Sequence, residues 1–259
     1  MKYFVFSDVH GHYSILKDEL RKAGFDVNNE NHMLISLGDN FDRGKENYEM
    51  FLFLKKMKEL NKIILVKGNH EDLMFNMIYS KHPTNIDINN GTYGTIEEFA
   101  EVYCNNKDGF LDSYYDLYNH LKKDGFLDFI TDMLDYYETD HFVFTHGFIP
   151  VDMDTTYRYC PFWRDSTGRS FEESRWTNGI YMSIYHNIGE PNKKIVVGHF
   201  HSSYGNVRKA YGMNLTNFEY RSLEYSNFDF FDIYEDNNII AIDACTVYSK
   251  KVNVLVVED

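Results

Sequence analysis

Basic residues are scarce in this sequence. Its 259 residues include 26 Lys and Arg against 40 Asp and Glu, which gives a formal net charge of -14. Nucleic-acid binding needs many cations, because they displace counterions from the phosphate backbone. We therefore do not expect nucleic acid as a partner, and a nuclease is a less favoured enzyme class. A phosphate-bearing substrate stays compatible with this charge, since metal ions and a few arginines can dominate the electric field at one site.

Cysteine and long apolar runs are scarce as well. The three cysteines include no Cys-x-x-Cys pair, and an odd number cannot form a complete disulfide framework. Reduced thiols of this kind are typical of a cytoplasmic protein. No apolar run approaches the roughly 20 residues that a membrane helix needs, and the apolar start at 1–6 is too short for a secretory segment. The sequence thus predicts a cytoplasmic protein without a membrane partner.

Proline is also rare, with four residues, whereas 43% of the residues are hydrophobic. This composition is untypical of disordered or collagen-like chains, and the length suffices for a sizeable core. We expect a single domain over residues 1–259. Within it we expect a helical insertion at about 72–140 and an irregular segment at about 151–194, rich in Arg, Trp and Tyr, that borders the substrate.

Apolar runs and helical periodicity alternate along the chain, which is typical of an α/β protein with a mostly parallel sheet. Strands are predicted at 3–6, 33–37, 63–66, 142–145 and 195–197, and two closing antiparallel strands at 239–242 and 252–257. Helices are predicted at about 16–23, 46–60 and 126–137. A polar loop is predicted at 80–94, followed by a helix that opens at the capping-box pattern of 95–98.

Short polar motifs follow the predicted strands. Open α/β sheets place their sites at the carboxyl ends of the strands, because loops from neighbouring strands converge there. Residues about 30 positions apart in the sequence are therefore expected to meet in space. The motifs are DVHG at 8–11, GDNFDRG at 38–44, GNHE at 68–71, HG at 146–147 and GHFH at 198–201.

The first two motifs and the last one can hold one metal ion. Divalent metals in proteins take carboxylate, amide or imidazole ligands. Asp8 and His10 are two residues apart and can face the same ion. Asp39 can bridge this ion to a second one through its two carboxylate oxygens, and His201 can return to the first ion.

The remaining ligand-type residues can hold the second metal ion. Asn69, His146 and His199 are expected to complete its ligand set with Asp39. Two ions roughly 3.5–4 Å apart would hold a bridging hydroxide and stabilise the attacking and leaving oxygens of a phosphoryl transfer.

Three residues of the second and third motifs are free for catalysis. His70 can donate a proton to a leaving oxygen, and Asp42 can orient that histidine through its other nitrogen. Arg43 offers a planar fork for phosphate oxygens. Arg43 and Asn69 are the expected substrate contacts in these motifs.

A second phosphate clamp can come from the 151–194 segment. Arg164 and Arg175 each lie beside a tryptophan, Trp163 or Trp176. For each arginine, the alternative to substrate binding is packing of the Trp–Arg pair at the surface.

Taken together, the five motifs resemble those of the calcineurin-like metallophosphoesterase superfamily. GDxxDRG followed by GNHE is similar to the phosphoprotein phosphatase branch, with its serine/threonine protein phosphatases, small bacterial and phage phosphatases and symmetrical diadenosine tetraphosphatases. The resemblance extends over residues 8–201. It implies a four-layer α-β-β-α sandwich with mixed sheets, and it assigns the same metal ligands and catalytic roles as above. The last motif departs from the branch, which usually carries a single histidine there, and is similar to the wider superfamily, in which the last histidine binds the first metal.

We therefore expect a dinuclear-metal-dependent phosphoesterase that hydrolyses phosphate monoesters by direct attack of a metal-bridging hydroxide. Its substrate would be a phosphoprotein, as for serine/threonine protein phosphatases, or a small phosphate ester. Manganese is the first choice of metal, with iron, zinc and nickel as alternatives. Two other functions stay open: a bis(5'-nucleosyl)-tetraphosphatase-like hydrolase with a nucleotide pocket in the 151–194 segment, and a non-catalytic binding scaffold on the same fold.

Overall fold

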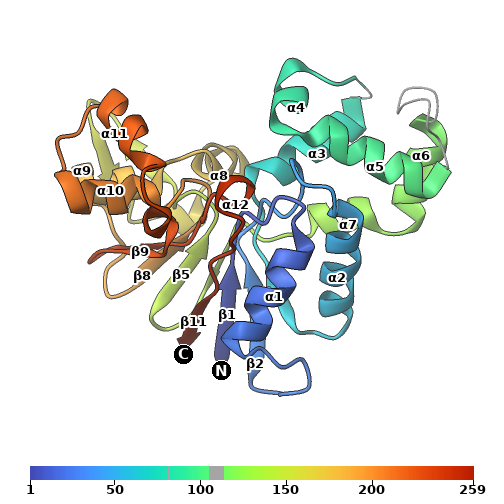
Figure 1. Cartoon of the computed structure of the whole chain (residues 1–259), viewed down its shortest axis with the longest axis horizontal. Coiled ribbons are helices and arrows are strands. Elements are labelled where there is room, and N and C mark those ends of the chain that lie inside the picture. The colour runs from blue at the N-terminus through green and yellow to red at the C-terminus, as the bar shows by residue number, and fades with distance from the viewer. Residues whose placement is uncertain (81, 105–113) are drawn as a thin grey trace.

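Two β-sheets face each other in the middle of the molecule, and helices cover the outer face of each (Figure 1). The computed structural model describes residues 1–80, 82–104 and 114–259. One buried cluster fills the space between the sheets, and two further clusters join each sheet to its own helices. This is the four-layer α-β-β-α sandwich that the sequence predicts.

The first sheet has the strand order β11-β1-β2-β3. Strands β1 (Lys2–Phe6), β2 (His32–Ser36) and β3 (Ile63–Leu65) are parallel, and β11 (Leu255–Glu258) runs antiparallel to β1. Helices α1 (Tyr13–Ala23) and α2 (Asn47–Glu59) provide the crossovers between the parallel strands. The sheet is mixed. The strands predicted at 3–6, 33–37 and 63–66 and the helices predicted at 16–23 and 46–60 are confirmed, whereas the strand expected at 252–257 begins only at Leu255.

The second sheet has the strand order β4-β5-β8-β10-β9. Strands β5 (Phe142–Thr145), β8 (Lys194–Val197) and β10 (Ile239–Ala241) are parallel, with β4 (Tyr136–Glu138) and β9 (Tyr234–Glu235) antiparallel at the edges. The strand predicted at 239–242 as antiparallel is β10, which pairs antiparallel with β9 but parallel with β8. Helices between β8 and β10 form a crossover, which returns the chain in the same direction.

Strand β1 shows how the layers are built. Tyr3 and Val5 face the second sheet, whereas Phe4 and Phe6 face the helices, because alternate side chains of a strand point to opposite faces. All four side chains are buried, at most 8% exposed. A strand apolar on both faces is typical of a sheet covered on both sides.

A helical segment packs against α2 on the helical side of the first sheet. It consists of α3 (Asn69–Ser80), α4 (Asn85–Asn90), α5 (Thr92–Cys104), α6 (Tyr114–Lys123) and α7 (Phe126–Thr131). Residues 105–113 of the expected insertion lie outside the described part of the chain.

Two predictions in this segment were wrong. The expected polar loop at 80–94 contains α4, which opens on a capping box between Thr84 and Asp87, and α5 already begins at Thr92 rather than at Thr95. The helix expected at 126–137 ends at Thr131. Beyond it, Leu134 is drawn into a β-bridge with Val66, since its backbone bonds to β3 and to the residue after Val66.

The segment 151–194, expected to be irregular, has regular structure. A hairpin of β6 (Val151–Met153) and β7 (Tyr157–Tyr159) is followed by the 3-10 helix η2 (Trp163–Asp165) and by helices α8 (Gly168–Arg175) and α9 (Gly179–His186). These elements have only three to eight residues each, too few for a helical or strand period to repeat and reveal them.

The chain closes with short elements around the second sheet. These are α10 (Ser203–Tyr211), α11 (Asn217–Glu224), the 3-10 helix η3 (Phe228–Phe231) and α12 (Thr246–Ser249). Within the described ranges, the helices are all too short or too polar to span a membrane.

Candidate metal centre

The loops after five parallel strands meet at one edge of the two sheets. The backbone N–H of Asp8, after β1, donates to Gly38 after β2 (3.1 Å), and the N–H of Gly198, after β8, donates to His146 after β5 (2.8 Å). A further hydrogen bond joins the two sheets: the N–H of His199 donates to the Asp8 carboxylate at 2.9 Å. The five motifs therefore form one cluster, as the strand-end rule predicts.

The backbone of this cluster is strained. Asp8, His10, Asp39, Asp42 and His199 all have φ between +48° and +75°, the left-handed region that non-glycine residues rarely adopt. Each such residue costs on the order of 1 kcal/mol or more, so the surrounding contacts must hold it there. Strain of this kind gathers where side chains have to be aimed at a common point.

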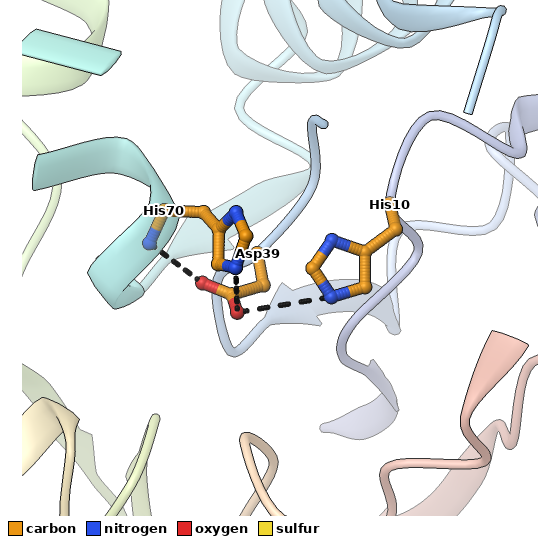
Figure 2. A group of neighbouring side chains, drawn as sticks. All are labelled: His10, Asp39 and His70. Carbon is orange, nitrogen blue, oxygen red and sulfur yellow. Dashed lines mark hydrogen bonds and ion pairs between the residues drawn. The ribbon is translucent and has the colours of Figure 1, made fainter. Parts of the chain in front are cut away.

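Asp39 lies at the centre of the cluster, and its two oxygens face different histidines. Oδ2 is 3.9 Å from Nε2 of His10 and 3.8 Å from Nε2 of His70 (Figure 2). Oδ1 is 3.2 Å from Nε2 of His146. Two groups of potential ligands thus share this carboxylate, one with His10 and His70 and the other with His146 and His199.

The histidine rings are oriented by backbone carbonyls. Nδ1 of His146 bonds to the carbonyl of Leu37 at 2.6 Å, and Nδ1 of His10 bonds to that of Phe41 at 3.0 Å. Each ring therefore turns Nε2 toward the cluster, as metal-binding histidines do. Nε2 of His146 also lies 2.9 Å from the amide oxygen of Asn69. Nε2 of His146, which lies beside oxygens of Asp39 and Asn69, can therefore carry a proton or bind a cation.

The buried carboxylates of the cluster repel one another, and a bound cation would offset this repulsion. Burial raises the pKa of Asp8 to about 8, and repulsion from the carboxylates of Asp243 and Asp39 adds to the rise. Burial lowers the pKa of His146, but the charge of Asp39 outweighs this effect and raises it to about 9. Buried like charges are unfavourable without a counter-charge. A divalent cation among these oxygen and imidazole atoms supplies that charge, so the residues fit a metal.

His70 is paired with Asp42 within the same cluster. Nδ1 of His70 donates to the Asp42 carboxylate at 2.6 Å. Burial lowers the pKa of His70, but the charges of Asp39 and Asp42 outweigh it and leave the pKa raised. Arg43 is exposed, and its two terminal nitrogens donate to Nε2 of His10 (2.9 Å) and of His70 (3.1 Å).

Two threonines of the helical segment hold the Asp42 carboxylate. The hydroxyl of Thr92 donates to Oδ2 at 2.6 Å and that of Thr95 donates to Oδ1 at 2.7 Å. Asp42 is fully buried, so the helical segment supplies hydroxyl donors that water would otherwise supply. Sequence analysis gave neither threonine this role, since both lie about 50 residues from Asp42 and no pattern links them to it.

Glu71 fastens the two loops that carry Asp39 and Asn69. One oxygen accepts from the N–H groups of Asp39 and Gly68, both at 2.9 Å, and the other accepts from the N–H (2.9 Å) and side-chain amide (3.0 Å) of Asn40. Its side chain is fully buried. Glu71 thus sets the positions of the loops through their backbone.

The last motif is split between two environments. His199 is in the Asp39 group, and burial together with the neighbouring His146 lowers its pKa to about 3. His201 belongs to neither ligand group in the described part of the chain. Its Nδ1 donates to Glu224 at 2.9 Å, and burial, which lowers its pKa, is outweighed by the charge of Asp243, which leaves the pKa raised.

Asp243 was missed by sequence analysis. It is buried, follows strand β10 and lies close enough to Asp8 and His201 to perturb both pKa values. The signal was present, because an aspartate directly after an apolar strand is the pattern of Asp8 and Asp39. It was overlooked since β10 was assigned to an antiparallel pair.

The two arginines of the 151–194 segment have carboxylate partners. Arg164 binds Glu138 and Glu190, each at 2.8 Å, and its guanidinium carbon lies 4.3 Å from the ring centroid of Trp163.

Arg175 is 4% exposed and binds Asp72 at 2.6 Å and Asp135 at 2.7 Å. Among the contacts of the described ranges, neither Arg164 nor Arg175 reaches Asp39 or its histidines, and both are held in ion pairs.

Comparison with known sequences covers nearly the whole chain. The family model described as calcineurin-like phosphoesterase matches residues 1–242. The serine/threonine-protein phosphatase 2 of Salmonella typhimurium (strain LT2) is 43% identical over 68 residues, which are 26% of this chain and 28% of that protein. The asymmetrical bis(5'-nucleosyl)-tetraphosphatase PrpE of Bacillus subtilis (strain 168) is 25% identical over 124 residues, 46% of this chain and 50% of that protein. The matches span half or less of each relative.

A solved structure described as a cold-active protein tyrosine phosphatase is similar in fold. It aligns with 99% of this chain and 73% of its own, with a TM-score of 0.50 and 16% sequence identity. At this identity the likeness concerns the arrangement of the layers, and it agrees with the four-layer sandwich described above.

Proposed function

We propose that this chain, which belongs to the calcineurin-like phosphoesterase family, is a dinuclear-metal-dependent phosphoesterase that hydrolyses phosphate monoesters. The observation that carries the proposal is the Asp39 carboxylate, whose two oxygens face two separate groups of imidazoles. A shared carboxylate of this kind suits a pair of cations. The match to the Salmonella phosphatase supports a likeness to the phosphoprotein phosphatase branch.

The metal ions would be held by the residues around Asp39. We assign His10 to the first ion and the cluster of Asn69, His146 and His199 to the second. We assign Asp8 to the first ion because its carboxylate is buried in the same cluster, where the charge of Asp39 acts on it. Two divalent cations at these positions, when bound, would activate the attacking water and neutralise charge on the phosphate. Manganese is our first choice, because hard oxygen donors are mixed with imidazoles here.

The remaining polar groups would act on the phosphate and the leaving oxygen. His70 keeps a proton on Nδ1 for Asp42, and once Arg43 turns to the phosphate its Nε2, which faces the cluster, can carry another. Its raised pKa favours the protonated form, as a proton donor to the leaving oxygen requires. Arg43 donates to two imidazoles, and turning its fork to phosphate oxygens would exchange these bonds for charge-assisted ones.

A His70→Asn variant tests the catalytic assignment. We expect hydrolysis of p-nitrophenyl phosphate with Mn²⁺ to fall roughly 100-fold or more, the usual effect of a lost proton donor, while two Mn²⁺ per chain are still bound. His82→Asn, at an exposed position, is the matched control and should keep full activity. Equal turnover in the two variants would remove His70 from the mechanism.

The rival class, a binding scaffold without catalysis, is tested by metal analysis. Protein purified without chelators should contain Mn, Fe, Zn or Ni, and a chain without any of them would favour the scaffold.

A second candidate is hydrolysis of dinucleoside polyphosphates. It is supported by the match to the Bacillus tetraphosphatase and by an aromatic cavity that shares His199 with the candidate metal centre.

A further inference from the structure

A cavity of about 610 Å³ opens beside the candidate metal centre. It lies between the loop after β8 and the helices α10 and α11, which are neighbours on the side of the second sheet (Figure 1). His199 and His201 are among its lining residues. Since His199 also belongs to the Asp39 group, a molecule in this cavity would adjoin the phosphate site. The other lining residues are Phe200, Tyr204, Asn217, Tyr220, Arg221, Glu224 and Tyr225.

The cavity wall is rich in aromatic rings. Phe200, Tyr204, Tyr220 and Tyr225 line it, and the rings of Tyr204 and Tyr220 have centroids 5.3 Å apart. Buried Arg208 braces this pair from outside the cavity, with its guanidinium 3.7 Å and 4.8 Å from the two centroids. The wall is therefore rigid, and aromatic rings of a rigid wall can hold a planar ring by stacking.

The charge available to a ligand in the cavity is positive. Arg221 is exposed, and in the described part of the chain no carboxylate is paired with it. Glu224 faces the same space but is already engaged, since it accepts hydrogen bonds from His201 (2.9 Å), Ser203 (2.7 Å) and Tyr220. In a chain of net charge -14, an unpaired arginine beside a phosphate site is a local attraction for anions.

We propose that this cavity binds the base of a nucleoside phosphate, so that the substrates of this phosphoesterase are nucleotides or nucleoside polyphosphates. The ring would stack among the aromatic side chains, and Asn217 could read the polar edge of the base. Arg221 would contact a phosphate that is not being cleaved. The proposal rests on the proposed phosphoesterase function.

The chemical step is ordinary hydrolysis. Oxygen from water forms the new bond to phosphorus, the bond from phosphorus to the nucleotide oxygen breaks, and that oxygen takes up one proton.

A nucleoside fits this cavity better than the side chain of a phosphotyrosine. A phenyl ring would fill only part of about 610 Å³ and offers no hydrogen-bonding edge to the amide of Asn217. A base offers both a π-face and donors and acceptors on its edge, as in other protein sites that hold single bases. The cavity also differs from the 151–194 segment, where the sequence placed a nucleotide pocket, because 199–225 build it.

The test compares two substrates in three variants. Tyr225→Ser removes one ring of the wall, and Arg221→Gln removes the unpaired charge. Phe218→Ser is the matched control, because Phe218 is on the same helix, 83% exposed and absent from the wall. Steady-state kinetics with Mn²⁺ are measured for diadenosine tetraphosphate, which carries the base, and for glycerol 2-phosphate, which does not.

We expect Tyr225→Ser to raise the ratio of the two KM values, nucleotide over glycerol phosphate, roughly ten-fold, as the loss of one stacking contact does. Arg221→Gln should raise the same ratio, because a charged contact to phosphate is lost. The control should leave the ratio unchanged. Calorimetric titration with AMP should show a parallel loss of affinity. An unchanged ratio in both cavity variants would overturn the proposal, as would a larger effect on glycerol 2-phosphate than on the nucleotide.

Failure of the proposed function would look different. If neither substrate is hydrolysed with any metal, the phosphoesterase assignment fails. AMP binding that is weakened by Arg221→Gln but not by Phe218→Ser would then still support the cavity as a nucleotide site, and absence of AMP binding would overturn it.

Discussion

Replacing Glu71 by glutamine should loosen the loops that carry Asp39 and Asn69. Glu71 accepts four N–H donors, two on each carboxylate oxygen, and its side chain is fully buried. Glutamine has the same shape but only one acceptor oxygen. Its amide nitrogen would therefore face two N–H groups that have no other acceptor within the fold, and those donors would stay unsatisfied.

The size of the effect follows from these four bonds. A hydrogen bond to a charged group contributes about 1.5–3 kcal/mol, and two such bonds are lost. Part of this loss is offset, because burial and the nearby Asp39 charge raise the pKa of Glu71, which shows that its ionised form is itself unfavourable. We expect a net loss of roughly 2–4 kcal/mol in the free energy of unfolding, equivalent to a fall in Tm of roughly 5–12 °C for a chain of this size.

The assay is urea and thermal unfolding of Glu71→Gln, combined with calorimetric titration of Mn²⁺. Glu49→Gln, the same chemical change at an exposed position of α2, is the control and should stay within about 0.5 kcal/mol of the parent protein. Mn²⁺ affinity should fall in the Glu71 variant, since the Asp39 loop is less well held. If both variants unfold alike, Glu71 does not fasten the loops.

Three further outcomes are expected. Thr92→Val removes a buried hydrogen bond to the Asp42 carboxylate, which should lower the free energy of unfolding by about 2 kcal/mol and lower turnover. Thr92→Ser restores the hydroxyl and should regain most of the stability in urea unfolding and most of the turnover in phosphate release. Gly198→Ala places a Cβ 2.0 Å from a side-chain oxygen of the loop after β1, so Tm should fall by an amount equivalent to about 1–3 kcal/mol, as measured by thermal unfolding. Burial raises the pKa of Asp124, but hydrogen bonds, above all from Lys55, outweigh burial and leave the pKa below 3.8. The stability that the Lys55–Asp124 pair contributes is therefore present above pH 3.8 and is lost as the pH falls through the lowered pKa. Asp124→Asn should therefore destabilise by about 0.5–1 kcal/mol at pH 7 and by less at pH 3, as measured by urea unfolding at both values.

The sequence predicted the sheets and the meeting of the motifs because both depend on local signals. Strand β1 reads as a continuous apolar run, and Asp8 follows it directly. A polar residue after a buried strand lies at the sheet edge whatever the rest of the chain does. The convergence of Asp8, Asp39, Asn69, His146 and His199 needed no knowledge of the side-chain packing.

Hydrogen-bond and ion-pair partners that only tertiary packing brings together could not be predicted from the sequence. Thr95 reads as the start of a helix, yet its hydroxyl is drawn to Asp42, and α5 begins three residues earlier. Arg175 reads as a phosphate clamp or a surface partner of Trp176, yet it is buried and bound by two aspartates far apart in the sequence. In each case the sequence identifies a hydrogen-bonding group correctly, while the partner depends on how the helical segment docks on the sheets.

The His70–Asp42 pair depends on the helical segment as well as on the strand loops, because the hydroxyls of Thr92 and Thr95 hold the Asp42 carboxylate. During refolding, the sheets and their motif loops could form before α5 reaches its place. The His70–Asp42 pair would then lack its last two anchors, so recovery of hydrolysis should trail recovery of β-structure, and enzyme activity would report when this outer shell of helices arrives.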